Sequence, residues 1–176
     1  MKTYTTTLFS TTTLALCGML LLSPNSKAEV KTPTLSATEE IFIQNAAAFG
    51  LSDLKIAELA VKKADNADIK AFAKKAVTDH TKVNKELNTL AANQGVKIST
   101  VLTPAHAEAL QKLENVKGAE FDKEFLAEVL HSHHIHMTSY EKESKDHNDK
   151  ELKAFVDKTI PTMQAHYDKA KLLAAK

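Results

Sequence analysis

The sequence predicts an all-α protein built as an antiparallel four-helix bundle, with a short extra helix between the second and third long helices. Gly and Pro are scarce, at four each in 176 residues, whereas Ala, Lys, Glu and Leu are abundant and all favour helices. Apolar residues recur at alternating spacings of three and four, which is typical of helices that bury one face. Capping residues divide this pattern into four long segments joined by short connections, the arrangement of a bundle.

The first 28 residues are interpreted as a signal peptide. Lys2 supplies a positive start, an apolar run covers residues 14–22, and small residues follow at Ser26 and Ala28, so cleavage is expected after Ala28. The run of about nine residues is too short to span a bilayer. Cys17 offers an alternative, a lipoprotein anchor, but a large residue precedes it and the apolar run continues beyond it, so ordinary cleavage is favoured.

The mature chain is expected in the periplasm or outer envelope, with residues 29–37 as a flexible segment and residues 38–175 as one bundle domain. Cleavage removes the one cysteine, which excludes disulfides, cysteine nucleophiles and thiolate metal sites. It also removes two of 23 basic residues, so 21 remain against 22 acidic ones and the net charge is about −1. Every basic residue is Lys, whereas recognition of phosphate and guanine favours Arg. Together with the near-zero net charge, the absence of Arg argues against nucleic-acid binding. No later apolar run has the length of a transmembrane segment.

Capping residues delimit the first two long helices. Ser36 and Glu39 match a capping box, so the first helix begins there and continues to about residue 64. Asp65 or Asn66 then caps the second helix, which runs to about residue 93 before Gly95 ends it.

The remaining helices follow the same signals. Thr103 and Pro104 open the short extra helix, as N-cap and first helical residue, and Gly118 ends it. The third long helix covers about residues 119–144. A polar turn leads into the fourth long helix, at about residues 149–175.

Four histidines fall on the apolar seams of these helices, at positions that otherwise belong to the core. They are His80 in the second long helix, His133 and His136 in the third, and His166 in the fourth. A buried imidazole without a partner costs roughly 1–3 kcal/mol, so each needs a metal, a carboxylate, a carbonyl or water. Two interpretations remain open: a metal site between the helices, or a hydrogen-bonded polar network that fixes helix register.

Glu58 in the first helix is the candidate carboxylate for a metal site. It shares a face with three aliphatic residues at helical spacing, but the helix carries a second apolar stripe, so its inward orientation stays open. The predicted ligand set is Glu58, His80, His133 and His166, with His136 in reserve. Imidazoles with one carboxylate suit Zn, Cu, Ni or Fe(II).

Three other residues near the seams are interpreted as surface groups. His131 and His134 share a second, more exposed face of the third helix, where they could chelate a divalent ion weakly but fit a solvated surface better. Asp79 lies one residue off the seam, where it either orients a neighbouring group or is a surface charge, and the surface charge is favoured.

A series of short segments along the mature chain matches the pattern of a known family. The segments are Phe42 with Ala46-Ala47, Glu58-Leu59-Ala60, Lys70-Ala71-Phe72-Ala73, Asp79-His80, Gly118-Ala119-Glu120-Phe121-Asp122, His133, Glu151-Leu152-Lys153-Ala154-Phe155, and Thr159-Ile160-Pro161 with His166. In these the chain resembles the bacterial domain-of-unknown-function family numbered 4142, whose members carry the label of outer membrane proteins and are grouped with the ferritin-like superfamily. The resemblance covers residues 38–173. It implies a ferritin-like four-helix bundle in the periplasm or outer envelope, and little about function.

The chain departs from its relatives at positions that bear on metal chemistry. The third helix of the family usually carries an Asp before its histidine, whereas Ser132 stands there in this chain. Ferritin-like di-iron proteins place a Glu three residues before each of two histidines, whereas Val77 and Met163 precede His80 and His166 here. The carboxylate-rich di-iron site is therefore absent, and ferritin-type oxygen chemistry or iron storage is not expected.

Two functions remain in view. The first is an exported bundle that binds a transition metal through its seam histidines. The second is a non-catalytic structural or interaction protein of the envelope, linked to stress and with an envelope protein as partner, whose histidines form a buried polar network. An enzyme is disfavoured, because the chain has no Gly-rich phosphate loop, nucleophile elbow or HExxH motif. No pattern in the sequence indicates the oligomeric state.

Overall fold

The computed structural model describes residues 35–146 and 149–176, whose helices belong to one unit, residues 31–176. The helices are α1 (Ala37–Lys63), α2 (Ala67–Asn93), α3 (Pro104–Asn115), α4 (Gly118–Asp146) and α5 (Lys150–Ala174). The predicted signal peptide, with Cys17, and the segment as far as residue 34 lie outside the described residues. Among the helices described, none combines the length and the apolar character that crossing a membrane requires.

The helices begin where the sequence predicts their caps. Ser36 Oγ accepts a hydrogen bond from the backbone N–H of Glu39 at 3.2 Å, and the Glu39 carboxylate accepts one from the N–H of Ser36 at 2.6 Å, which completes the capping box of α1. The side chains of Asn66 and Thr103 cap α2 and α3 by accepting hydrogen bonds from backbone N–H groups of the first turn. Gly118 has a φ of 62°, in the left-handed region that favours glycine, at the junction between α3 and α4.

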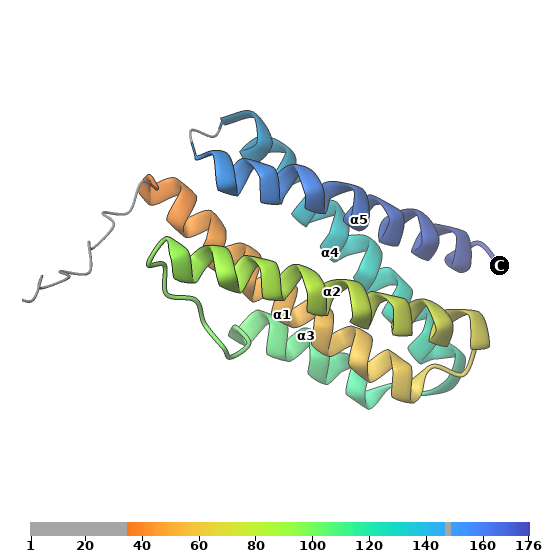
Figure 1. The fold of residues 1–176 in the computed structure, drawn as a ribbon. Helices are drawn as coiled ribbons and strands as arrows, with labels where there is room; N and C mark the ends of the chain where they lie inside the picture. The colour runs from red at the N-terminus through yellow and green to blue at the C-terminus, as the bar shows by residue number, and fades with distance from the viewer. Residues whose placement is uncertain (1–34, 147–148) are drawn as a thin grey trace, which may run out of the picture. The chain divides into compact units, whose positions relative to one another are not determined.

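Neighbouring long helices run antiparallel, because α3 carries the chain back along the bundle between α2 and α4 (Figure 1). α1 and α5 both pack against α2 and α4, and α3 packs on the outside of α1. At one end, the N–H groups of Asp65 and Asn66 donate to the buried carboxylate of Asp122 in α4, at 3.2 and 2.8 Å. At the other end, the N–H of Asp149 donates to Glu39 at 3.2 Å. The predicted antiparallel four-helix bundle with a short extra helix is confirmed.

Two apolar clusters fill the interior, one toward each end of the bundle. Phe42, Leu87 and Phe155 belong to the first, and Phe72 and Phe121 belong to the second. Between the clusters, each long helix contributes polar side chains to what we call the polar layer: Asp53 from α1, His80 from α2, His133 and His136 from α4, and His166 from α5. The apolar packing above and below this layer holds its side chains in place.

Candidate metal centre

Three imidazoles meet at the centre of the polar layer. His80, His133 and His166 come from α2, α4 and α5, and one ring nitrogen of each lies within 4.8 Å of the others. Their exposed fractions are 8 %, 2 % and 3 %, so bulk water has almost no access to them. We call these three residues the histidine triad.

Two nitrogens of the triad already have the spacing of ligands that share one metal. Nε2 of His133 and Nδ1 of His166 are 3.3 Å apart. Two nitrogens bound to a tetrahedral metal at about 2.0–2.1 Å lie about 3.3 Å from each other. Either a proton or a metal ion must lie between them, because two facing lone pairs would repel each other.

The outward-facing nitrogens of the same two rings are held by polar groups. Nε2 of His166 lies 2.8 Å from Oδ2 of Asp79, and Nδ1 of His133 lies 3.2 Å from Oγ of Ser132. Ser132 donates its own proton to the carbonyl of Val129 at 3.4 Å, which leaves its oxygen free to accept from His133. When both outer nitrogens carry the proton, the inner nitrogens present their lone pairs to one point, as metal ligands require.

A buried contact between a carboxylate and an imidazole lies beside the triad. Oδ2 of Asp53 is 3.3 Å from Nδ1 of His136, and the two side chains are only 10 % and 7 % exposed. The ring of His136 also stacks on Phe49, with ring centroids 3.9 Å apart. These contacts hold His136 next to His133, with ring centroids 6.3 Å apart.

Burial controls the charge state of the layer. It lowers the pKa of His133 to about 4, and it also lowers the pKa of His80, because an imidazolium loses its hydration there. Burial by itself would raise the pKa of Asp53, but the hydrogen bond from His136 and the nearby imidazoles hold this pKa well below its usual range. At neutral pH the layer therefore combines the neutral imidazoles of His80 and His133 with the ionised carboxylate of Asp53.

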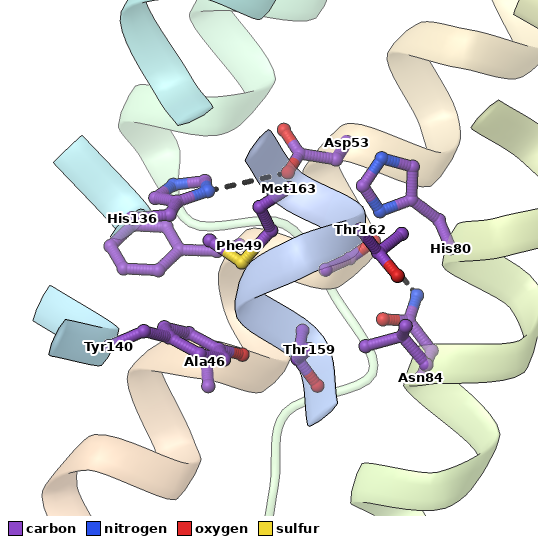
Figure 2. Close-up of a pocket in the computed structure, with 12 residues that line it drawn as sticks. Ala46, Phe49, Asp53, His80, Asn84, His136, Tyr140, Thr159, Thr162 and Met163 are labelled. Atoms are coloured by element: carbon purple, nitrogen blue, oxygen red, sulfur yellow. Dashed lines mark hydrogen bonds and ion pairs between the residues drawn. The ribbon is translucent and has the colours of Figure 1, made fainter. Parts of the chain in front are cut away.

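A small cavity of ≈ 30 Å³ adjoins the layer (Figure 2). His80, Asp53 and His136 line it together with Asn84 and Gly50 of the α1–α2 contact. Nδ2 of Asn84 donates to the carbonyl of Gly50 at 2.8 Å, whereas its buried Oδ1 has no partner among the described residues. The volume fits a water molecule, so the cavity offers a polar space that reaches the triad at His80.

The structure brings four of the five predicted site residues into this layer. His80, His133 and His166 form the triad, and His136 lies beside it. Glu58 is not brought to them: its carboxylate is 40 % exposed and forms an ion pair with Lys55 at 3.2 Å. The role of the four histidines as metal ligands stays a prediction.

Asp53 occupies the place that the sequence analysis assigned to Glu58. Five residues separate the two, which is about 140° around a helix of 3.6 residues per turn, so they face different ways. Gly50 turns Asp53 inward, because the missing side chain lets Asn84 of α2 pack against the backbone of α1, and a residue three positions later shares that face. The glycine inside the helix is the signal from which this rotation could have been predicted.

Asp79 is not the surface charge that the sequence favoured. Its side chain is 20 % exposed and lies 2.8 Å from Nε2 of His166. Periodicity within α2 places Asp79 correctly at the edge of the seam, but it does not reveal that a ring from α5 reaches this edge. The alternative interpretation, that Asp79 orients a neighbouring group, fits the structure.

The fold and the polar layer together define an all-α bundle protein with a buried histidine cluster. The chain belongs to the family described as "Domain of unknown function (DUF4142)", whose model matches residues 24–173. The family resemblance identified in the sequence is thereby confirmed. No curated protein is significantly similar to the chain in sequence.

Solved structures share this helical fold at low sequence identity. A DUF305 fragment from Deinococcus radiodurans has a TM-score of 0.71 at 11 % identity, over 80 % of this chain and 98 % of that one. CopM in its Cu(II)-bound form has a TM-score of 0.67 at 19 % identity, over 78 % of this chain and 95 % of CopM. CopM in its Cu(I)-bound form has a TM-score of 0.65 at 19 % identity, over 76 % and 93 % of the two chains. Identities this low establish a common fold alone.

Proposed function

We propose that this protein is an exported bundle that binds one copper ion through His80, His133 and His166 and has no catalytic role. The observation that carries the proposal is the triad itself: three buried imidazoles, from three helices, with ligand atoms within 4.8 Å of one another. Removing three imidazoles from water costs free energy, and a bound metal would offset that cost because its binding energy adds to folding energy. Export rests on the predicted signal peptide.

The donor set favours copper among Zn, Cu, Ni and Fe. Neutral imidazole is a good ligand for all four, and Cu(II) stands highest in the affinity order of the divalent ions. Iron sites in helical bundles use several carboxylates, whereas the triad consists of nitrogens alone. CopM has the same fold and has been solved with Cu(II) and with Cu(I) bound, which supports copper as the metal here.

The alternative is a structural or interaction protein of the envelope, in which the layer fixes the register of the helices. The contacts of His166 with Asp79, of His133 with His166 and of His133 with Ser132 favour this alternative. With His133 donating to His166 and Ser132 donating to His133, they would hold both rings in place without a metal. In that case, replacing His166 would lower stability by roughly 1–3 kcal/mol, because His133 and Asp79 would each lose a hydrogen-bond partner, and no metal would change the stability.

The first test is elemental analysis of the mature protein, purified without a His-tag or chelator, followed by titration with Cu(II), Cu(I) and Zn(II). We expect about one equivalent of copper per chain, and a Tm that rises with metal concentration because the metal binds the folded state. His80→Gln and His166→Gln should each abolish stoichiometric uptake, because each removes one of three ligands.

The matched control lies on the exposed face of α4. His131 and His134 are exposed there, so the double variant His131→Gln, His134→Gln should keep the copper and the rise in Tm. If the parent protein takes up no metal, or if the triad variants still bind one equivalent, the proposed site is wrong and the polar network becomes the preferred function.

A further inference from the structure

Two neighbouring cavities share lining residues, one inside the bundle among the four long helices and one between α2 and α5. The inner one is the cavity of ≈ 30 Å³ that His80 lines (Figure 2). The outer one, of ≈ 90 Å³, is lined by Asp79 and by the ion pair of Glu86 and Lys158. The side chains that line both cavities are Val83, Thr159 and Thr162. These side chains therefore separate the outer cavity from His80.

Asp79 links the outer cavity to the triad a second time. Its carboxylate lines that cavity and lies 2.8 Å from Nε2 of His166. A cation in the outer cavity would therefore meet the Asp79 carboxylate, which lies next to the ring of His166. The inner cavity, which His80 lines, is on the other side of Val83. Each connection therefore leads to one imidazole of the triad, His80 in the first case and His166 in the second.

We propose that the metal ion reaches the triad between α2 and α5, through the outer cavity and past Val83 and Thr162, and that the Glu86–Lys158 ion pair controls its rate of entry. The inference rests on the proposed function, because it assigns a route to the same site. Nζ of Lys158 donates to both carboxylate oxygens of Glu86, at 2.9 and 2.8 Å. The pair thus joins α5 to α2 at the outer cavity and neutralises a carboxylate that would otherwise attract a cation.

A second groove on the same pair of helices is the competing route. It measures ≈ 400 Å³, and His166 and Phe72 line it. It shares no lining residue with the inner cavity. Its charged residues are Lys75 and Lys169 against Asp68, whereas the outer cavity balances two Lys with two carboxylates. The groove therefore repels a cation more than the outer cavity does.

The route is tested by the kinetics of Cu(II) binding to the mature protein in stopped-flow experiments at low salt. Lys158→Gln frees the Glu86 carboxylate and should raise the association rate constant roughly two- to tenfold, whereas Glu86→Gln frees Lys158 and should lower it by a similar factor. Lys169→Gln is the control for Lys158→Gln, because it removes one positive charge from the competing groove instead of the outer cavity. It should leave the association rate constant within about twofold of the parent. The differences should shrink at about 1 M salt, where the Debye length is about 3 Å.

A steric variant gives a second measurement. Val83→Phe narrows the passage between the two cavities and should slow association and dissociation by the same factor, roughly tenfold, with Kd unchanged, because a barrier alters neither end state. Val83 also packs against the apolar core, so the surface charge variants carry the test if this variant does not fold.

The outcomes separate the route from the site. A response to Lys169→Gln, with none to Lys158→Gln or Glu86→Gln, would overturn the route and leave the copper site in place. Equal rate constants in all three charge variants would overturn it as well. If the parent protein binds no copper at all, the proposed function fails and the route fails with it.

Discussion

His166 illustrates, at the scale of single residues, how a side chain outside the triad can orient an imidazole of the proposed metal site. The Asp79 carboxylate at its Nε2 also accepts two hydrogen bonds from Lys75, at 3.0 and 2.8 Å. Burial would raise the pKa of Asp79, but the hydrogen bonds from Lys75 and His166 lower it, so the carboxylate is ionised at neutral pH. An ionised acceptor holds the proton on Nε2 and leaves Nδ1 free to bind a metal.

We therefore expect Asp79→Asn to weaken copper affinity by about 10- to 100-fold, the usual effect of removing a partner that orients a ligating histidine. The affinity is measured by competition with a chromophoric copper chelator. Asp68→Asn is the matched control, because Asp68 lies on the same helix in an exposed ion pair with Lys176. Equal affinities in the parent and in Asp79→Asn would show that His166 keeps its tautomer without this carboxylate.

The residues of the layer differ in how far the sequence predicts them. Helical periodicity indicates which face of its own helix a residue occupies, and it correctly placed His80 and His166 on buried seams. It does not state which residue of another helix stands opposite. Asp53 and Asp79 acquire their partners only when α1 meets α4 and α2 meets α5. Asp53 was not among the predicted ligands, and the orientation of Glu58 stayed open, because the rotation of α1 depends on its contact with α2.

At the scale of elements, that rotation depends on the contact between Gly50 and Asn84. A Cβ added at Gly50 would overlap with Oδ1 of Asn84, and Nδ2 of Asn84 donates to the Gly50 carbonyl at 2.8 Å. Glycine normally weakens a helix interior by about 1 kcal/mol relative to alanine. Here it allows a close approach of α1 and α2 at the level of the cavity, which brings Asp53 to His136.

A double-mutant cycle tests this contact. Gly50→Ala alone should destabilise the protein by roughly 1–2 kcal/mol, because the methyl group displaces the Asn84 amide and leaves buried polar groups unpaired. In an Asn84→Ala background the same substitution should be neutral or stabilising by up to about 1 kcal/mol, because alanine is the better helix former. Denaturant unfolding measures all four proteins. Additive effects would show that the two residues do not interact.

The elements and their antiparallel bundle were largely predictable, whereas the individual contacts between distant helices were not. The caps of α1, α2 and α3 depend on contacts within about four residues, so the sequence identified Ser36 and Thr103 and narrowed the cap of α2 to Asp65 or Asn66. The return path of α3 depends on contacts between distant segments, such as Asp122 of α4 with the turn after α1. No periodicity within one helix encodes such a contact.

At the scale of the whole molecule, the polar layer makes stability depend on pH. The pKa of His133 is about 4 in the fold, compared with about 6.5 for an unfolded chain. Between these values the unfolded chain binds more protons than the folded one, so stability rises with pH across this window and is lost as pH falls through it. The lowered pKa of His80 acts in the same direction. The pKa of Asp53 is lowered in the fold, so its ionised carboxylate also contributes stability. This contribution is lost mainly below about pH 3.9, the usual pKa of aspartate.

We expect the metal-free protein to lose roughly 3 kcal/mol of stability from His133 alone between pH 7 and pH 4, at about 1.4 kcal/mol for each unit of pKa difference. Denaturant unfolding at a series of pH values measures this slope. His133→Gln should flatten it, whereas His131→Gln, at an exposed position of the same helix, should leave it unchanged. Bound copper should steepen the acid transition, because the ligands must be neutral to hold the metal and protons displace it as pH falls. A slope that His133→Gln does not alter would mean that the pKa of this imidazole is the same in the folded and the unfolded chain, and that burial of His133 does not cause the loss of stability in acid.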